Sequence, residues 1–456
     1  MQQINPNIFK KYDIRAVYGT DLNENTAYQI GQSFVNYTKA KTIIVGYDAR
    51  ISSPSLKEAL IKGIIHQGSN VIDIGLCSAS CFYFTLGESK LDAGIMITAS
   101  HVSKEFNGFK LMFKDAMPLN KEQILNFKKL VLENQWPAIN IKGKTIQQDP
   151  SENYVNAIRK SIKEKIKPLK VVMDPGNGTA GLYIKKVFAQ TGILVIPIFF
   201  EPDGNFPNHE TNPKIPENRK KLAEKIVSEK ADLGFMFDGD ADRLGILDRN
   251  GNIINYSLVL AIISEFRVKN FSQKKIVIEV RTSNIVRDWV EKAGGSIEIS
   301  VSWTIPIKLK MKNDKEIIFG GETSGHYIFP EMHDSDDGIF AGLTFLQAIS
   351  AKNESIDEII KKFEQEYFVL EEQNFKINNL NEVDKILKKL ENKYSSEGAQ
   401  IFKIDGLSAI FPNWWFNLRT SETEPFIRLN FEANSKELFE QKKKELICAI
   451  EKELAS

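Results

Sequence analysis

The stretch Leu233-Gly-Phe-Met-Phe-Asp-Gly-Asp-Ala-Asp-Arg243 places three alternating carboxylates directly after a short apolar run. The apolar run predicts a buried strand, and loops at the carboxyl ends of such strands hold ligands in α/β sheets. Alternate residues of an extended loop point the same way, so Asp238, Asp240 and Asp242 are expected to converge. Converging carboxylates need a cation, and hard oxygen ligands suit Mg2+. The stretch therefore predicts an α/β fold with a magnesium site at a sheet edge.

Three other interpretations of this loop were weighed. A solvated acidic turn does not explain the apolar strand before it. An EF-hand would need Gly and Glu where Arg243 and Arg249 stand. A phosphatase that uses its first Asp as nucleophile is a better rival, because it also has strand-Asp-x-Asp. The third carboxylate and the adjacent Arg243 favour the metal loop.

Short runs rich in Val and Ile alternate with amphipathic stretches of helical length along most of the chain. Fully apolar strands between helices indicate sheets that are covered on both faces. Asn250-Gly251, between two apolar runs, predicts a two-residue hairpin turn and therefore some antiparallel pairing. The 456 residues exceed what one core supports, so three α/β units in tandem are expected. Lys-rich helical segments flank short strands near the end and predict a smaller α+β domain there.

The predicted domain boundaries follow from this pattern. The first α/β domain, with the serine loop, covers 1–147, and the second, with the metal loop, covers 148–252. The third α/β domain covers 253–365, and the α+β domain covers 366–456. The three α/β domains are expected to have mixed sheets, with polar residues in loops that follow the strands.

Charge and composition restrict the class of partner. Lys plus Arg (60) nearly equals Asp plus Glu (59), which gives no global field for nucleic acid or an anionic membrane. No apolar run approaches the ~18–20 residues that span a bilayer, and no signal-peptide pattern is visible. Three cysteines do not make a disulfide framework. We expect a cytoplasmic protein that binds a small anion through a local cationic site, with no nucleic-acid or membrane partner.

Three further loops carry reactive or binding groups. In Thr98-Ala-Ser-His101, a Ser on a tight turn after a strand could react, although a helix cap is the alternative. The Ser has no G-x-S-x-G elbow around it, which argues against an α/β-hydrolase. Gly320-Gly-Glu-Thr-Ser-Gly-His326 offers mixed polar groups for sugar hydroxyls, or a Gly-rich turn. The segment from Arg419 to Arg428 offers a phosphate cradle, or a surface turn before a strand.

Together and in this order, these four segments resemble the α-D-phosphohexomutase family, in its phosphomannomutase/phosphoglucomutase branch. Further motifs that carry the resemblance are Phe9-Lys-Lys-Tyr-Asp-Ile-Arg15, Gly46-Tyr-Asp-Ala-Arg50, Asn107-Gly-Phe-Lys110, Asp174-Pro-Gly-Asn-Gly-Thr-Ala-Gly181 and Asp203-Gly-Asn-Phe-Pro-Asn-His209. The resemblance implies three α/β domains and a smaller α+β domain around a central cleft. It also implies an isomerase that interconverts the 1-phosphate and 6-phosphate of mannose or glucose.

The resemblance also implies residue roles. Ser100 would carry the phosphoryl group, and a phosphoserine oxygen would bind Mg2+ with Asp238, Asp240 and Asp242. Charge neutralisation and proton transfer would fall to Arg15, Lys110, His101 and His326. Substrate would contact Tyr12, Arg15, Arg243, Arg281, Glu322, Ser324, His326, Arg419, Ser421, Thr423 and Arg428. A hexose 1,6-bisphosphate would be the intermediate and activator, and the protein would be a monomer or weak homodimer.

Four departures from the family pattern concern substrate identity. Val102-Ser103 replaces the usual Asn-Pro, and Arg281 stands where relatives usually have Lys. Ser302-Trp-Thr-Ile-Pro306 lacks the usual Gly-His, and Glu422 places a carboxylate in the phosphate cradle. Two alternatives therefore stay open: a mutase for a pentose or amino-sugar phosphate, and a non-catalytic sugar-phosphate-binding protein.

Overall fold

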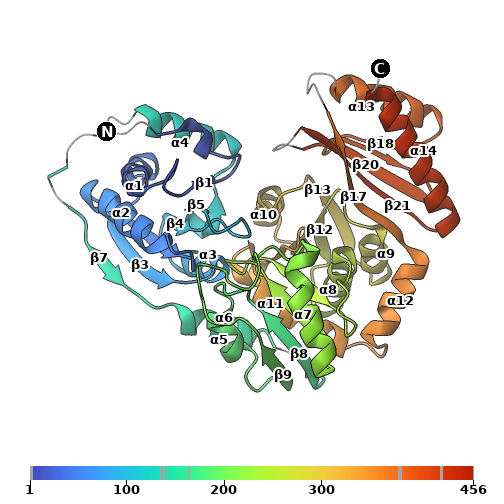
Figure 1. Cartoon of the computed structure of the whole chain (residues 1–456), viewed down its shortest axis with the longest axis horizontal. Coiled ribbons are helices and arrows are strands. Elements are labelled where there is room, and N and C mark those ends of the chain that lie inside the picture. Colours follow the sequence, from blue (N-terminus) through green and yellow to red (C-terminus); the bar gives the residue numbers. More distant parts are fainter. Residues whose placement is uncertain are drawn as a thin grey trace. The chain divides into compact units, whose positions relative to one another are not determined.

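The computed structural model describes residues 4–133, 136, 139–140, 142–162, 165–377, 383–421 and 425–454. The chain forms two compact units (Figure 1). One unit comprises Met1–Ile254 and Ser324–Ala351, and the other comprises Asn255–Thr323 and Lys352–Ser456. Within the described residues, no helix is long and apolar enough to span a membrane.

The first unit begins with a mixed seven-stranded sheet. Its strands are β1 (Ile14–Val17), β5 (Phe106–Phe113), β4 (Ala93–Ile97), β2 (Thr42–Tyr47), β3 (Asn70–Leu76) and β7 (Thr145–Gln147) in sheet order, with β6 (Met117–Pro118) beside β5. β4, β2, β3 and β7 run parallel, whereas β5 is antiparallel to both β1 and β4. The helices are α1 (Glu24–Thr38), α2 (Ser53–His66), α3 (Ala79–Glu88) and α4 (Lys121–Glu133). All five residues of β4 are buried, as an apolar strand covered on both faces requires.

A four-stranded sheet follows in the same unit. Its order is β11 (Leu244–Leu247), β10 (Leu233–Phe237), β8 (Leu169–Asp174) and β9 (Ile193–Pro197), with β11 antiparallel and the others parallel. Its helices are α5 (Ser151–Lys160), α6 (Gly181–Val187) and α7 (Pro216–Glu229). The unit also contains the antiparallel pair β15 (Tyr327–Phe329) and β16 (Ser335–Asp336), and α11 (Gly338–Ser350).

The hairpin turn after β11 is one residue longer than predicted. The N–H of Asp248 donates to the carbonyl of Asn252 at 2.8 Å, and the N–H of Gly251 donates to the carbonyl of Asp248 at 3.0 Å. The loop therefore comprises residues 249–251. Gly251 has a φ of 81°, the left-handed conformation that glycine adopts in a three-residue hairpin loop.

The second unit contains a parallel sheet and an antiparallel sheet. β12 (Lys275–Glu279) lies between β13 (Ser296–Ser300) and β14 (Ile317–Gly321), with α8 (Tyr256–Asn270), α9 (Asn284–Lys292) and α10 (Thr304–Asn313). After α12 (Ile356–Glu366), the C-terminal sheet has the order β17 (Phe368–Lys376), β21 (Phe426–Ala433), β20 (Trp414–Thr420), β19 (Leu407–Ile410) and β18 (Gln400–Phe402). α13 (Val383–Ser396) and α14 (Lys436–Leu454) pack on it. The predicted fold class, three α/β domains and a smaller α+β domain, is confirmed.

Candidate active site

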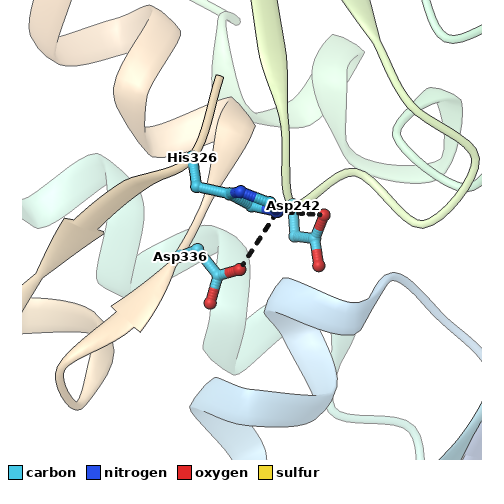
Figure 2. Close-up of side chains that lie close together, drawn as sticks. All are labelled: Asp242, His326 and Asp336. Atoms are coloured by element: carbon cyan, nitrogen blue, oxygen red, sulfur yellow. Dashed lines mark ion pairs between the residues drawn. The ribbon is translucent and has the colours of Figure 1, made fainter. Parts of the chain in front are cut away.

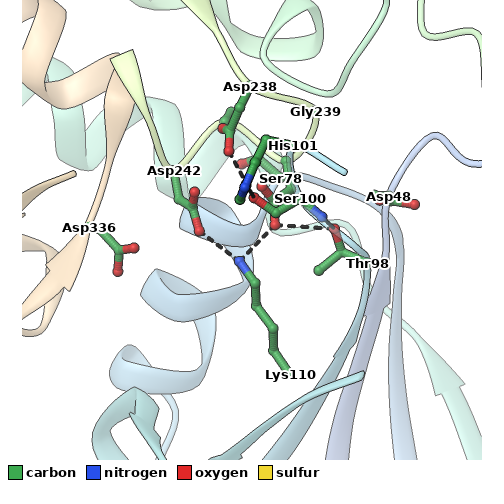
Figure 3. A network of polar contacts seen from close by, with 12 residues as sticks. Asp48, Ser78, Thr98, Ser100, His101, Lys110, Asp238, Gly239, Asp242 and Asp336 are labelled. Carbon is green, nitrogen blue, oxygen red and sulfur yellow. Dashed lines mark hydrogen bonds and ion pairs between the residues drawn. The ribbon is translucent and has the colours of Figure 1, made fainter. Parts of the chain in front are cut away.

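Ser100 lies in the loop that follows β4, and it is 4% exposed. Its φ of 53° is uncommon for a residue with a side chain, and such conformations cluster at functional sites. The backbone N–H of Ser100 donates to Thr98 Oγ1 at 2.9 Å. Its hydroxyl donates to Asp238 Oδ2 at 2.9 Å, as Figure 3 shows. The loop therefore directs the serine hydroxyl at the first aspartate of the predicted metal loop.

The buried guanidinium group of Arg50 holds the serine loop in place. It donates hydrogen bonds of 2.6–2.9 Å to four carbonyl oxygens, those of Ser100, Val102, Ser103 and Phe106. Asp48 Oδ2 accepts a bond from Arg50 Nε at 3.1 Å and fixes the guanidinium. Arg50 thus constrains a loop that lacks the Asn-Pro usual in the family.

The three aspartates of the loop between β10 and β11 converge. Asp238, Asp240 and Asp242 are each at most 2% exposed, and ligand atoms of all three lie within 4.8 Å of one another. Gly239 allows this loop to approach the serine loop, because a Cβ at this position would lie 2.9 Å from the Ser100 carbonyl oxygen. The geometry brings together the serine and the carboxylates that the sequence analysis singled out.

Lys110, on β5, supplies positive charge to this cluster. Its Nζ lies 2.6 Å from Asp242 Oδ2 (Figure 3). It also lies 2.7 Å from Asp240 Oδ2. Burial alone would lower the pKa of Lys110, but the two carboxylates raise it well above its usual value. Burial, Asp242 and Asp240 raise the pKa of Asp238 well above the ordinary range. Burial would also raise the pKa of Asp242, yet Lys110 and His326 hold it low.

The donor set fits a hard metal ion. Asp240 Oδ1 is buried and accepts no hydrogen bond from the described part of the chain. Three carboxylates with Lys110 and Arg243 nearby still leave negative charge that a divalent cation would neutralise, and oxygen ligands suit such an ion. Asp238, Asp240 and Asp242 could therefore hold a metal, with an oxygen on Ser100 beside them.

His326 connects the metal loop to a third segment of the same unit. Figure 2 shows its ring between two carboxylates, with Nε2 lying 3.4 Å from Asp242 Oδ1 and 3.7 Å from Asp336 Oδ2. Arg243 Nε donates to Nε2 at 3.2 Å, and Nδ1 lies 2.8 Å from Ser324 Oγ. Because Nε2 accepts from an arginine, the neutral ring carries its proton on Nδ1.

His101 is the imidazole next to the serine hydroxyl. Its Nδ1 lies 3.1 Å from Ser100 Oγ. Burial, and then the charges of Arg243 and Arg15, lower the pKa of His101 well below its usual value. The ring is therefore neutral near pH 7 and can accept a proton.

Arg15 is the second residue of β1, and Tyr12 lies on the segment just before that strand. Arg15 Nη2 pairs with Asp13 Oδ2 at 2.6 Å, and its buried Nε donates to no acceptor within the described residues. Tyr12 is half-buried, and the Lys11 ammonium lies 5.1 Å from its ring centroid.

In the second unit, three predicted cationic residues surround one carboxylate that was not predicted. Glu372 lies 3.1 Å from Arg419 Nη2, 3.3 Å from Arg428 Nη1 and 3.8 Å from Arg281 Nη1. Glu279 also pairs with Arg281. The predicted phosphate cradle thus contains an internal anion.

The remaining predicted positions of this unit are Glu322 and Ser421. Glu322 is buried, and its Oε2 accepts from the N–H of Trp303 at 3.0 Å. Trp303 has a φ of 96° and is 42% exposed, which is a strained conformation for an aromatic residue. The N–H of Ser421 donates to the carbonyl of Phe426 at 2.8 Å. Thr423 and Glu422 lie outside the described residues.

The sequence did not predict Asp336, Glu279, Glu372 or the role of Arg50. Asp336 and Asp337 precede the apolar stretch 338–350, and an acidic residue before such a stretch is a helix N-cap pattern. Asp337 does cap α11, accepting from the N–H of Phe340 at 2.9 Å. Arg50 ends a motif that was noted only for its resemblance. Glu279 and Glu372 had no local pattern to reveal them.

Comparison with known proteins covers nearly the whole chain. Residues 6–137, 152–251 and 255–367 match phosphoglucomutase/phosphomannomutase alpha/beta/alpha domains I, II and III, and 370–447 match the C-terminal domain. A phosphomannomutase of Escherichia coli is 34% identical over 452 residues, which are 97% of this chain and 98% of that protein. A phosphomannomutase of Methanocaldococcus jannaschii is 34% identical over 450 residues, 98% of each chain.

A solved structure agrees with the sequence comparison. The crystal structure of a phosphoglucomutase/phosphomannomutase family protein from Burkholderia thailandensis superposes with a TM-score of 0.88 at 29% identity. The match covers 99% of this chain and 98% of that one. All four domains occur in the family order, and the chain therefore belongs to the phosphoglucomutase/phosphomannomutase family.

Proposed function

We propose that this protein is a phosphohexomutase that interconverts the 1-phosphate and 6-phosphate of mannose or glucose. The observation that carries the proposal is the 2.9 Å hydrogen bond from Ser100 Oγ to Asp238, inside a buried trio of carboxylates. A hydroxyl in that position can hold a phosphoryl group next to a metal ion. Family membership and the names of the relatives support the same activity.

In the proposed reaction, Ser100 carries a phosphoryl group before substrate binds. The 6-hydroxyl oxygen of a hexose 1-phosphate attacks phosphorus while the bond from phosphorus to Ser100 Oγ breaks. The hydroxyl proton passes to a basic group, and the product is a 1,6-bisphosphate. This intermediate turns end for end. Ser100 Oγ then attacks the phosphorus of the 1-phosphate, the bond from that phosphorus to the sugar O1 breaks, the basic group returns its proton to O1, and hexose 6-phosphate leaves. The two transfers conserve the phosphoryl group.

We assign the cation as Mg2+, held by Asp238, Asp240 and Asp242 with a phosphoserine oxygen. The oxygen-only donor set supports this assignment, and so does Asp240 Oδ1, which has no hydrogen-bond partner among the residues that the structure describes. When bound, Mg2+ neutralises charge on the transferring group.

Side chains of the first unit are proposed to bind the phosphoryl oxygens, supply positive charge and transfer the proton. Arg15, whose Nε has no acceptor among the described residues, is suited to bind the transferring phosphoryl oxygens. Lys110 keeps its proton and contributes a fixed positive charge. His101 is neutral and 3.1 Å from Ser100 Oγ, so it is the better placed proton acceptor, with His326 as the second candidate.

In the second unit, Arg281, Arg419, Ser421 and Arg428 are proposed to hold the phosphate that does not react. Glu322 is proposed to accept hydrogen bonds from sugar hydroxyls. A clamp that accepts either phosphate lets the bisphosphate bind in both orientations, which the reaction requires.

The test is turnover of mannose 1-phosphate and glucose 1-phosphate with Mg2+ and a trace of the 1,6-bisphosphate. We expect formation of the 6-phosphate, and we expect intact-mass spectrometry to detect one phosphoryl group that Ser100→Ala removes. Ser103→Ala makes the same change three positions along the loop and serves as the matched control. A folded protein that converts no hexose phosphate would refute the proposal.

A second candidate is a mutase for another phosphosugar. Trp303 favours it, because an exposed tryptophan whose backbone N–H binds Glu322 alters the surface near a proposed sugar-binding residue. Relative kcat/KM values for hexose, pentose and amino-sugar phosphates decide between the two.

A further inference from the structure

Two arginines of the C-terminal sheet are direct cross-strand neighbours. Arg419 on β20 and Arg428 on β21 are paired in the antiparallel register. Like charges directly opposite one another on two strands destabilise a sheet. Arg281 belongs to the same cluster. The pKa of Arg419 is lowered by its own burial and, to a smaller extent, by the charge of Arg281. Such a guanidinium cluster requires an anion.

Glu372 provides such an anion from the neighbouring strand, in addition to Glu279, which pairs with Arg281 alone among the three arginines in the described contacts. Its Oε2 accepts from Arg419 Nη2 at 3.1 Å and lies 3.8 Å from Arg281 Nη1. Its Oε1 lies 3.3 Å from Arg428 Nη1. A single carboxylate thus contacts three guanidinium groups.

An irregularity of β17 directs Glu372 toward the arginines. Leu370 pairs with Phe431, whereas Gln373 pairs with Leu429, so positions 371 and 372 together oppose only Asn430. Two residues opposite one are a β-bulge, and bulges change the direction of a side chain at functional sites. The direction of Glu372 is therefore specific to this local backbone.

The carboxylate does not satisfy all donors of the cluster. Arg419 is 8% exposed, and its Nε donates to no acceptor within the described ranges. Each guanidinium has five N–H donors, while a carboxylate has two oxygens. A phosphate group has three terminal oxygens and up to two negative charges, so it matches the cluster better than Glu372 does.

We propose that Glu372 is the resting counter-ion of the Arg281, Arg419 and Arg428 cluster, and that a substrate phosphate binds by displacing it. The inference rests on the proposed function, because it concerns the clamp assigned there. Glu372 then sets the affinity of the clamp, since its carboxylate and the phosphate compete for the same donors. Glu372 also favours phosphate over anions with a single charge, because a singly charged anion gains less binding free energy when it displaces the carboxylate from the arginines.

A purely structural role for Glu372 predicts the opposite effect. If the carboxylate only holds the arginines in position, its loss loosens the cluster and weakens phosphate binding. Competition predicts stronger binding instead. The direction of the change therefore separates the two roles.

The experiment is titration calorimetry of the full chain with inorganic phosphate, without added Mg2+, for the wild type and Glu372→Gln. We expect the Kd of Glu372→Gln to be lower by about tenfold, because a charged competitor becomes neutral. Glu437→Gln removes the same charge from the exposed start of α14 and is expected to leave the Kd unchanged. An equal or higher Kd in a folded Glu372→Gln protein would overturn the proposal.

Two further variants show whether the change in Kd depends on Arg419 and keep the proposal testable if Glu372→Gln does not fold. In an Arg419→Gln background, Glu372→Gln is expected to give a smaller gain, because Arg419 is one of the three guanidinium groups for which the carboxylate and phosphate compete. Glu372→Asp keeps the charge but shortens its reach, and we expect a smaller decrease in Kd. If Glu372→Gln does not fold, Glu372→Asp decides: a Kd at or above the wild-type value contradicts the proposal.

Phosphate binding and turnover give separate answers. Absence of turnover with every hexose phosphate would reject the proposed function, whatever the phosphate titration shows. Normal turnover with an unchanged Kd in Glu372→Gln would reject only the role of Glu372. For an active enzyme, the KM of glucose 1-phosphate is expected to fall with the phosphate Kd.

Discussion

Arg50 donates a hydrogen bond of 2.8 Å from its Nη2 to the carbonyl oxygen of Ser100, which lies 50 positions later in the chain. The same guanidinium group binds three other carbonyls of the loop and is itself fixed by Asp48. The position of the reactive hydroxyl therefore depends on a side chain from the loop between β2 and α2, which contacts no reacting atom. Its effect on the reaction can be measured apart from that of the serine itself.

The first prediction concerns Arg50→Lys. A lysine ammonium has three donors in place of five and cannot bind four carbonyls in one plane. We expect kcat to fall by about 100-fold, because a misplacement of about 1 Å has effects of that size, while KM changes little. Steady-state kinetics measure both values.

Arg249→Lys is the matched control for this variant, because Arg249 is an exposed arginine of the same unit. Its kinetics are expected to equal those of the wild type. A higher KM with an unchanged kcat in Arg50→Lys would contradict a positioning role.

The second prediction concerns the metal. Asp240→Asn removes one charge from the buried trio, so the Mg2+ concentration for half-maximal activity is expected to rise by at least about tenfold. Titration of Mg2+ against activity, after treatment with a chelator, measures it. Asp92→Asn changes an exposed aspartate of the same unit and serves as control. An unchanged Mg2+ requirement would exclude Asp240 from the metal site.

The third prediction concerns stability and pH. His209 Nε2 pairs with the buried Asp174 Oδ2 at 3.0 Å. Burial alone would lower the pKa of His209, but the hydrogen bond and charge of Asp174 raise it above 6.5. A raised pKa means that the charged pair stabilises the fold fully below the unfolded-state pKa of about 6.5, and that this contribution is lost as pH rises through the folded-state pKa.

We therefore expect His209→Gln to be more destabilising at pH 5.5 than at pH 9, by about 1–2 kcal/mol. Denaturant unfolding at the two pH values measures the difference. His66→Gln, at the surface end of α2, controls for general effects of removing an imidazole. A loss of stability that is larger at pH 9 would have the wrong sign for this pair.

The fourth prediction concerns Trp303. Its φ of 96° is strained for tryptophan and unstrained for glycine. We expect Trp303→Gly to leave the free energy of unfolding unchanged or raise it by about 1 kcal/mol, and to change the ratio of kcat/KM between sugar phosphates. Unfolding curves and a substrate panel measure the two effects. Lower stability with an unchanged substrate ratio would show that Trp303 serves packing rather than selectivity.

The metal loop and the α/β fold could be predicted from the sequence because both depend on local patterns. An apolar strand followed by alternating aspartates requires no knowledge of distant residues, and Asp238, Asp240 and Asp242 do converge. The turn at Asn250-Gly251 was predicted one residue too short. The dipeptide indicates a hairpin, but the register depends on how Asp248 pairs with Asn252.

The contacts of Arg50 and Glu372 could not be predicted because they join distant parts of the chain. Arg50 reaches carbonyls 50–56 positions away, and a backbone carbonyl has no sequence pattern that marks it as an acceptor. Glu372 is 47 positions from Arg419, and a bulge directs it there. Strand periodicity alone does not indicate a bulge.

The 4% exposure of Ser100 has a consequence for how the enzyme is maintained between encounters with substrate. In the proposed function, a phosphoryl ester at so enclosed a position meets bulk water rarely, so its spontaneous hydrolysis is slow and its half-life long. One priming event would then serve many turnovers. Bisphosphate from outside is consequently needed to start newly made protein, and only in small amounts afterwards.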